Sequence, residues 1–253
     1  MKFFDLFEHF YIINLPERTD RKRHMEKELE KIGIPFECDK VSLFKAIKPE
    51  NQYPFKSIGI KGVFMSHLSI LKDARKLGLK NFLILEDDAE FSRAFMESEV
   101  AIIKQLEDLQ WDIVQFGYCA MRKPILTEGM VKSQDDRKNF LIPFSGEITG
   151  AHCCAINGKT VDKLIDFLEG LINGPSGDRA KGPMPIDGAY NVFSWRSETN
   201  RFIAHPSLVS QISSRSDITP SRFDKNPMLR PILSIIRSLG LTRYFRVKRN
   251  REI

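Results

Sequence analysis

The sequence has few cysteines and no long apolar run, and each shortage excludes a class of protein. Its 253 residues include four cysteines that form no C-x-x-C pair, at Cys38, Cys119, Cys153 and Cys154. This spacing argues against a disulfide framework and favours reduced thiols in a cytosolic protein. No apolar run reaches the roughly twenty residues that a bilayer-spanning helix needs, and acids interrupt the apolar N-terminus. We therefore expect neither a transmembrane anchor nor a secretion signal.

Motifs of several common enzyme classes are also missing. The sequence has no G-x-G-x-x-G after a strand, no G-x-x-x-x-G-K-[ST], no G-x-S-x-G and no paired-histidine zinc motif. These motifs are typical of dinucleotide oxidoreductases, P-loop NTPases, α/β-hydrolases and zinc enzymes, respectively. Each of these classes therefore loses support.

Positive charge is concentrated at the C-terminal end. The formal net charge is +6, and residues 221–253 contain nine Lys or Arg against two acids, which leaves residues 1–220 close to neutral. We expect one domain over 1–220, a basic tail over 221–253, and no nucleic-acid binding. Four apolar tail residues fall on one helical face among arginines, at Leu229, Ile232, Ile236 and Leu239. The tail is thus predicted either to contact an anionic membrane surface or to dock on the core with a solvated basic end.

Apolar runs alternate with helical patterns along the chain. The predicted strands cover 10–14, 34–37, 82–85, 112–116, 151–156, 202–204 and 208–209. The predicted helices cover a charged segment that ends at Gly33, then 62–77, 92–109 and 159–168. This alternation indicates an α/β fold with a largely parallel sheet covered by helices. Two long loops, 121–147 and 170–185, are candidates for lids over a substrate.

The stretch from Asn81 to Phe91 carries the strongest functional signal. Four apolar residues lead directly into the three acids Glu86, Asp87 and Asp88. Carboxylates cannot stay unpaired in an apolar interior, so we expect them at the end of a strand, where hard oxygen donors suit Mg²⁺ or Mn²⁺ bound with substrate phosphates. The alternative is that Asp88 caps a helix that begins near Ala89 while the other two acids are solvated.

Five short blocks occur in a fixed order, at Tyr11–Arg21, Gly62–His67, Leu83–Phe91, Pro185–Asp187 and Pro206–Ile218. Together they resemble glycosyltransferase family 25, the lipopolysaccharide-type galactosyltransferases to which the collagen galactosyltransferases are related. The resemblance implies a GT-A type nucleotide-sugar-binding fold, a UDP-sugar donor that is most often UDP-galactose, a Mn²⁺ or Mg²⁺ ion, and transfer with inversion at the anomeric carbon.

The resemblance also implies roles for individual residues. It assigns to the donor site the residues Asn14, Arg18, Asp20, Arg21, Ser66 and His67. It assigns metal binding to Asp88, assisted by Glu86 and Asp87. Candidates for further donor contacts in the last block are Gln211, Arg215 and Ser216. His205 stands where family members often have Tyr, so it either adds a metal ligand or packs.

For some of these residues the sequence equally permits a structural role. His67 shares an apolar helix face with Phe64 and Leu68, which favours a hydrogen-bonded histidine in the core. Arg18 and Arg21 lie in the first turn of a charged helix, and Arg215 lies in a surface loop, where solvated side chains are usual.

An inverting transfer needs a base for the acceptor hydroxyl and positive charge for the departing diphosphate. Asp187 is the predicted base because it follows a flexible loop and lies apart in sequence from the acidic stretch; the alternative is a first-turn helix acid. Asp112 and Asp217 are the other candidate bases. Trp111 and Trp195 either stack on a sugar ring or pack in the core.

Taken together, these patterns predict a metal-dependent, cytoplasmic galactosyltransferase that extends a lipopolysaccharide or other cell-surface glycan, either free or as a peripheral protein at the inner face of the membrane. Its partners would be a nucleotide-sugar donor and a glycan or lipid-linked acceptor. The alternative is a carbohydrate- or membrane-binding module that has kept the fold and lost catalysis.

Overall fold

A computed structural model describes residues 2–119 and 140–212. Several predictions lie outside these residues: the basic tail, the domain boundary at 220, most of the loop 121–147, and the site candidates Arg215, Ser216 and Asp217. The described residues up to Gln211 form one compact unit.

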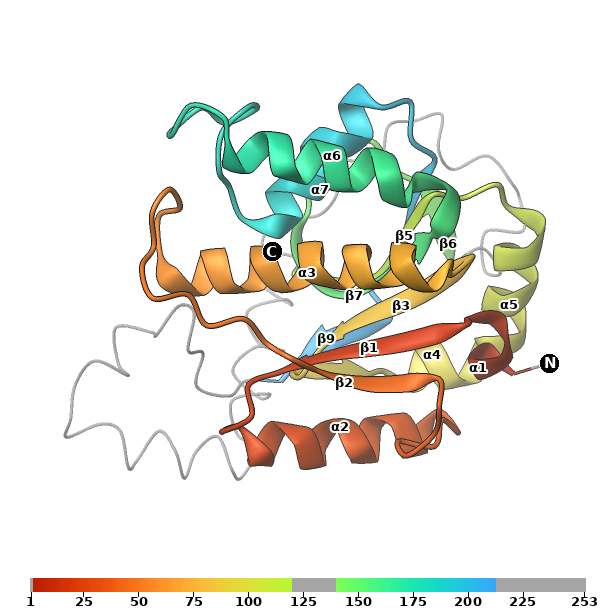
Figure 1. Cartoon of the computed structure of the whole chain (residues 1–253). Coiled ribbons are helices and arrows are strands. Elements are labelled where there is room, and N and C mark those ends of the chain that lie inside the picture. The colour runs from red at the N-terminus through yellow and green to blue at the C-terminus, as the bar shows by residue number, and fades with distance from the viewer. Residues whose placement is uncertain (1, 120–139, 213–253) are drawn as a thin grey trace, which may run out of the picture. The chain divides into compact units, whose positions relative to one another are not determined.

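The described residues contain a nine-stranded sheet (Figure 1). Its main path runs in the order β2-β1-β3-β7-β5-β8-β6, while β9 pairs with both β4 and β5. The strands are β1 (His9–Asn14), β2 (Val41–Lys45), β3 (Asn81–Glu86), β4 (Ala89–Phe91), β5 (Ile113–Cys119), β6 (Leu141–Pro143), β7 (Thr149–Asn157), β8 (Arg201–Ala204) and β9 (Val209–Gln211).

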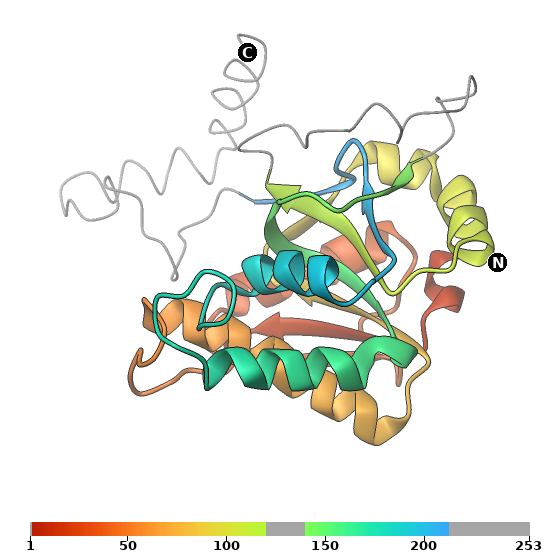
Figure 2. The ribbon, with the colours of Figure 1, turned by 90° about the horizontal axis from the view of Figure 1, so that it is seen from above.

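Helices cover both faces of this sheet. On one face lie α3 (Ile58–Leu77), α6 (Val161–Ile172), which follows the short 3-10 turn Gly158–Thr160, and α7 (Ile186–Arg196) (Figures 1 and 2). The other face packs against α1 (Phe3–Leu6), α2 (Thr19–Lys31), α4 (Arg93–Glu97) and α5 (Glu99–Asp108). Each face therefore has its own apolar core, centred on Met25 and Phe95 on one side and on Phe64 and Leu164 on the other. Burial of each such side chain contributes about 1.5–3 kcal/mol.

The α/β fold class is confirmed, but the sheet is mixed rather than largely parallel. β1 pairs in parallel with β2 and β3, whereas β7 runs antiparallel to both β3 and β5. Cys119 pairs with Thr149, so the chain leaves β5 and enters β7 at the same end of the sheet. The apolar pattern of the sequence predicted β5 and β7 at the right positions, but it did not indicate that the two strands run antiparallel.

The prediction of a strand at 34–37 is wrong, because the second strand is β2. Gly33 has a φ of 70° and turns the chain out of α2, after which Ile34 is buried and Phe36 packs on the core without joining the sheet. Pro35 also lacks the N–H that a central strand would need. The β1–α2–β2 unit nevertheless has the order of strand, charged helix and strand that the sequence predicts for this part of the chain.

The alternative in which Asp88 caps a helix is also wrong. Ala89–Phe91 form β4, which pairs with β9, and the next helix begins at Arg93. Ser92 caps that helix by accepting a hydrogen bond from Phe95 N–H at 3.1 Å. The predicted helix 92–109 is divided at Ser98 into α4 and α5.

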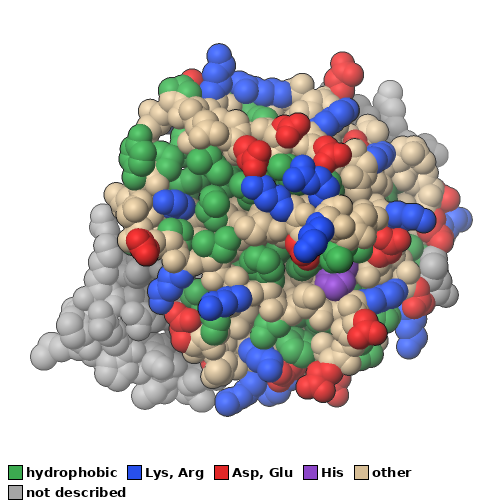
Figure 3. Space-filling model, in the orientation of Figure 1, with side chains coloured by type: hydrophobic (Ala, Val, Ile, Leu, Met, Phe, Trp, Pro, Cys, Tyr) green, Lys and Arg blue, Asp and Glu red, His purple; other side chains and the backbone are tan. Residues whose placement is uncertain are grey.

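Surface charge and cysteine placement agree with the composition. On the face seen in Figure 3, basic and acidic side chains are interspersed. Cys153 and Cys154 are buried, and within the described ranges none of the four cysteines lies in a disulfide. In those same ranges, no helix is both long enough and apolar enough to cross a bilayer.

Candidate functional site

The three acids form a cluster, here called the acidic cluster (Glu86, Asp87 and Asp88), at the carboxyl end of β3. β1 runs parallel to β3 with Ile13 opposite Glu86, so Asn14 ends its strand at the same edge. The buried run Phe82–Leu85 places β3 in the centre of the sheet, and the acids lie at the carboxyl end of this strand. Such edges are where α/β sheets bind ligands.

The carboxylate of Asp87 is bound by two side chains of the protein, Asn14 and Arg21. It is 7% exposed, accepts a hydrogen bond from Asn14 Nδ2 at 2.8 Å, and lies 2.5 Å from Arg21 Nη1. Burial raises the pKa of the Asp87 carboxyl, while Arg21 and Asn14 act in the opposite direction. Asp87 therefore fixes the cluster to β1 and α2.

Glu86 and Asp88 meet at a single amide. Gln211 Nε2, on β9, lies 3.3 Å from Glu86 Oε2 and 3.2 Å from Asp88 Oδ1. The other side of this amide is fixed as well, because Gln211 Oε1 accepts from Cys119 Sγ at 3.0 Å. Arg21 Nη1 also reaches Asp88 Oδ2 at 3.3 Å. The predicted residues Asn14, Arg21 and Gln211 are thus brought together with the acids.

Negative charge accumulates around Glu86. Burial and the charges of Asp88, Asp187 and Asp87 together raise its pKa to about 8, against the effect of Arg21. Asp187, a hundred residues along the chain, therefore lies close enough to act on Glu86 electrostatically. This concentration of charge suits a divalent cation.

The donor set fits a cation shared with a substrate and does not fit an all-protein cage. In the described part of the chain, no three His, Cys, Asp or Glu side chains are grouped so as to hold a metal ion. His205 Nδ1 is instead 3.0 Å from the hydroxyl of Tyr118, so the structure does not add His205 to Glu86 and Asp88. Mg²⁺ is usually held by one or two carboxylates together with substrate phosphates, and Glu86 and Asp88 supply two.

His67 lies beneath the acidic cluster with no exposed surface. Its Nδ1 is 2.9 Å from the hydroxyl of Tyr190, and its Nε2 is 4.0 Å from Glu86 Oε1. Burial lowers the pKa of the imidazole to about 3, so the ring is neutral. The structure thus has the hydrogen-bonded core histidine that the apolar helix face favoured.

Ser66 and Gly62, which belong to the same sequence block as His67, have structural roles. Ser66 is fully buried, accepts from Ile47 N–H at 2.9 Å and donates to Gly62 O at 2.7 Å. A Cβ atom at Gly62 would lie 2.7 Å from Ile47 O, so only glycine allows this approach. Ser66 fixes a loop and does not face the acids.

Arg18 and Asp20 form an ion pair at the start of α2. Arg18 Nη2 lies 2.9 Å from Asp20 Oδ2, and the Asp20 side chain is 65% exposed. The carbonyl of Arg18 accepts from Asn14 Nδ2 at 3.2 Å, which ties the helix start to the end of β1. Exposed pairs of this kind stabilise a protein by less than about 1 kcal/mol.

Asp187 occupies the first turn of α7. Its Oδ2 accepts from Gly150 N–H and its Oδ1 from Gly188 N–H, both at 2.8 Å. Asp112, by contrast, pairs with Lys159 at 3.3 Å at the start of β5, where the antiparallel neighbour β7 ends. Asp112 therefore lies at the far end of the sheet and is not a base for this site.

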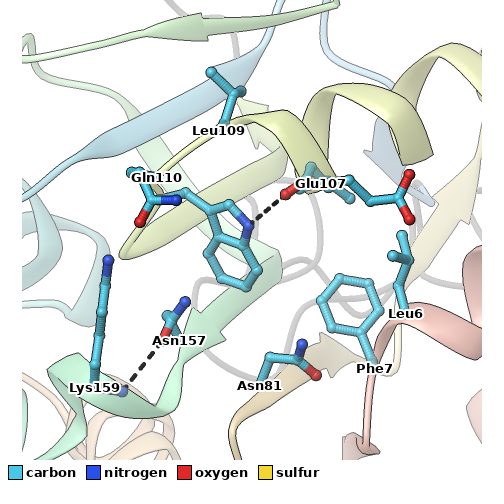
Figure 4. Close-up of a pocket in the computed structure, with 10 residues that line it drawn as sticks. Leu6, Phe7, Asn81, Glu107, Leu109, Gln110, Asn157 and Lys159 are labelled. Carbon is cyan, nitrogen blue, oxygen red and sulfur yellow. Dashed lines mark hydrogen bonds between the residues drawn. The ribbon is translucent and has the colours of Figure 1, made fainter.

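A cavity of about 290 Å³ lies at that far end (Figure 4). It is lined by Phe7, Asn81, Trp111 and Asn157, among others, and Asn81 begins the strand that Glu86 ends. The cavity and the acidic cluster are consequently separate. Trp111 is mostly buried here, whereas Trp195 on α7 is 47% exposed.

Sequence reasoning missed a buried polar group beside Asp187. Gln115 and Arg201 are 0% and 2% exposed, and Arg201 Nε donates to Gln115 Oε1 at 2.7 Å. Both residues lie in otherwise apolar strands, and no local pattern indicates that they meet. The only signals in the sequence are a polar residue within the predicted strand 112–116, which is Gln115, and a charged residue directly before the predicted strand 202–204, which is Arg201.

Comparison with known proteins identifies the class. Residues 7–187 match the family model described as "Glycosyltransferase family 25 (LPS biosynthesis protein)". This match covers more than half of the chain, and the class of protein is therefore a glycosyltransferase. Within that class the chain belongs to glycosyltransferase family 25, as its five sequence blocks predicted. Family and sheet together agree with the GT-A type of fold.

Curated relatives carry the same family name. The chain is 30% identical over 127 residues to a "Glycosyltransferase 25 family member" of Drosophila pseudoobscura pseudoobscura, covering 44% of this chain and 20% of that protein. It is 29% identical over 190 residues to one of Drosophila melanogaster, covering 65% and 30%. It is 27% identical over 132 residues to "Procollagen galactosyltransferase 1-B" of Xenopus laevis, covering 44% and 21%. The matches thus span between a fifth and a third of these relatives' length.

Among solved structures, the chain is similar to a glycosyltransferase involved in glycosylation of the major capsid of PBCV-1. The TM-score is 0.49 at 12% identity, over 82% of this chain and 94% of that chain.

Proposed function

We propose that this chain transfers galactose from UDP-galactose to a glycan acceptor, with inversion at the anomeric carbon and with a divalent cation. Family membership and the galactosyltransferase names of relatives support the choice of donor. The acceptor would be a lipopolysaccharide or other cell-surface glycan, built at the cytoplasmic face of a membrane to which the basic tail binds.

One observation carries the proposal: Glu86 and Asp88 share the amide of Gln211 at the carboxyl end of β3, and Arg21 Nη1 lies 3.3 Å from Asp88. Asp187 is close enough to raise the pKa of Glu86. A divalent cation held there by Asp88 and Glu86 would neutralise the diphosphate of the donor. Asn14 and Gln211 orient the acids, and Arg21 supplies a fixed positive charge next to the same position.

The acceptor hydroxyl oxygen attacks the anomeric carbon of the sugar while the bond from that carbon to the diphosphate oxygen breaks. UDP leaves with the bonding electrons, and Asp187 accepts the hydroxyl proton. Asp187 suits this role because its two oxygens are oriented by backbone N–H groups while its side chain is only partly buried.

The test is UDP release from a panel of UDP-sugars, with and without Mn²⁺ and with water as acceptor. We expect metal-dependent release from UDP-galactose in preference to the other donors. Release that is equal with and without the metal would contradict the role of the cation. The absence of both release and UDP binding would return the protein to the class of non-catalytic modules.

A further inference from the structure

The segment 145–150, which leads from β6 into β7 and includes the first two residues of β7, is held by one face of α7. Three α7 side chains, spaced four residues apart, form hydrogen bonds with its backbone. Asp187 accepts from a backbone N–H group, and Trp195 donates to a backbone C=O group. Asn191 accepts from an N–H group at 3.3 Å and donates to a C=O group at 2.9 Å. The bonds join Asp187 to Gly150, Asn191 to Ile148 and Trp195 to Ser145.

The sheet holds the same segment from its other side. Gln115 Nε2 on β5 donates to Gly150 O at 3.2 Å, and Gln115 Oε1 accepts from Arg201 Nε on β8 at 2.7 Å. Arg201 Nη1 also donates to Gly146 O at 3.3 Å. Gly150 is therefore fixed at both of its polar groups, through its C=O by Gln115 and through its N–H by Asp187.

Gly150 permits this arrangement because of its backbone conformation. Its φ is +90°, in the region that favours glycine. A Cβ atom there would lie 3.2 Å from Cys119 N and Sγ and from His152 Nδ1. The position is thus both strained and crowded for any other residue.

Hydrogen bonds connect Arg201 to Gln115, Gln115 to Gly150, and Gly150 to Asp187, and this series is here called the relay. Arg201, at its end, is an unusual residue for a buried position. It is 2% exposed, has no carboxylate within ion-pair distance among the described residues, and stacks on Phe144 at 5.5 Å. Its Nη2 has no hydrogen-bond partner in the described ranges. Burial lowers the pKa of Arg201 to about 10, while the charge of Asp187 acts in the opposite direction. A buried charge with so few partners is costly, so a purely structural role explains it poorly.

We propose that Gln115 and Arg201 are positioning residues which, through Gly150, fix the carboxylate of Asp187 for proton transfer from the acceptor. The inference rests on the proposed function, because it needs Asp187 to be the base. In this proposal, the hydrogen bond from Gly150 N–H fixes the position of Asp187 Oδ2, and the carboxylate keeps its other lone pairs available to the acceptor hydroxyl. A displacement of about 1 Å in such a group is enough to lower a rate by about a hundredfold.

The test uses Gln115→Glu and Gln115→Leu, assayed by UDP release from UDP-galactose with Mn²⁺ and water as acceptor. Gln115→Glu keeps an acceptor for Arg201 and removes the donor to Gly150, so it breaks the relay without leaving Arg201 uncompensated. We expect kcat to fall between about tenfold and a hundredfold, with KM for UDP-galactose within about twofold of the wild type. In an Asp187→Asn background the same change is expected to cause no further loss.

Asn191→Leu is the matched control, because it removes two hydrogen bonds to the same segment but leaves Gly150 and Gln115 in contact. We expect it to lower Tm with a much smaller effect on kcat. If Gln115→Glu keeps kcat within about twofold, or if Asn191→Leu lowers kcat equally, the inference is overturned while the base assignment stands. If Asp187→Asn keeps full activity, the base assignment fails and the inference fails with it. If the wild type neither releases nor binds UDP, the proposed function fails as well.

Discussion

Nη1 of Arg21 lies 2.5 Å from Asp87 and 3.3 Å from Asp88, so one guanidinium nitrogen binds two consecutive acids. All three side chains are at most 15% exposed. This contact joins α2, which precedes β2, to the turn after β3, and it fixes the direction in which Glu86 and Asp88 face. The site is therefore organised by a helix residue as much as by the strand that carries the acids.

Arg21→Ala is expected to destabilise the protein by about 3 kcal/mol, because it leaves the carboxylate of Asp87 buried with Asn14 as its remaining partner. Urea denaturation measures this change. Glu26→Ala on the same helix is the control, since Glu26 is 39% exposed and pairs with Lys22 at the surface. Its effect should stay below about 0.5 kcal/mol. Equal effects of the two variants would show that the Arg21 contact is not a buried ion pair in solution.

Glu28 supports the acidic cluster from α2. It is 2% exposed, and its Oε2 accepts from Phe91 N–H at 3.0 Å on β4, directly after the acids. Glu28→Ala would leave that N–H unsatisfied and should cost about 1–3 kcal/mol, whereas Glu28→Gln keeps an acceptor oxygen and should cost less. Denaturation of both variants tests the order, and a larger loss for Glu28→Gln would contradict this account.

His67 predicts how stability depends on pH. Its pKa is about 3 in the folded protein and near 6.5 in the unfolded chain, so the unfolded chain takes up the proton first. The contribution of neutral His67 is complete above about pH 6.5 and is lost as the pH falls toward 3. Between pH 6.5 and 4.5 the wild type should lose about 2 kcal/mol more than His67→Gln does. Parallel pH profiles for the two proteins would show that His67 is accessible to protons when folded.

The acidic cluster was predictable because its signal is local. An apolar run that ends in three acids predicts a strand with the acids at its end, and this prediction needs no information from other parts of the chain. Helix ends also have a local signal, because Gly33 and Gly78 end their helices with a positive φ. The pairing of Cys119 with Thr149 joins segments thirty residues apart, so the antiparallel direction of β7 had no local signal.

The same limit applies to the site. Asn14, Arg21 and Gln211 were named from sequence blocks, but their contacts with the acids cross between elements and appear only in the fold. Arg201 and Gln115 meet across two neighbouring strands, and neither belongs to a recognisable block. Ser66 shows the converse case, because a residue in a recognisable block binds the backbone of Ile47 rather than facing the site.

The proposed function depends on a cation that Asp88 and Glu86 hold and that the donor diphosphate shares. UDP release from UDP-galactose by the wild type and by Asp88→Asn, each over a range of Mn²⁺ concentrations, tests it most directly. Asn keeps an oxygen for Gln211 and removes the charge, so the fold should persist, as near-unchanged thermal unfolding would show. The exposed change Asp166→Asn on α6 serves as the control for lost charge. We predict that Asp88→Asn lowers release by about a hundredfold or more while Asp166→Asn does not. Wild-type release by Asp88→Asn at every Mn²⁺ concentration would contradict the account.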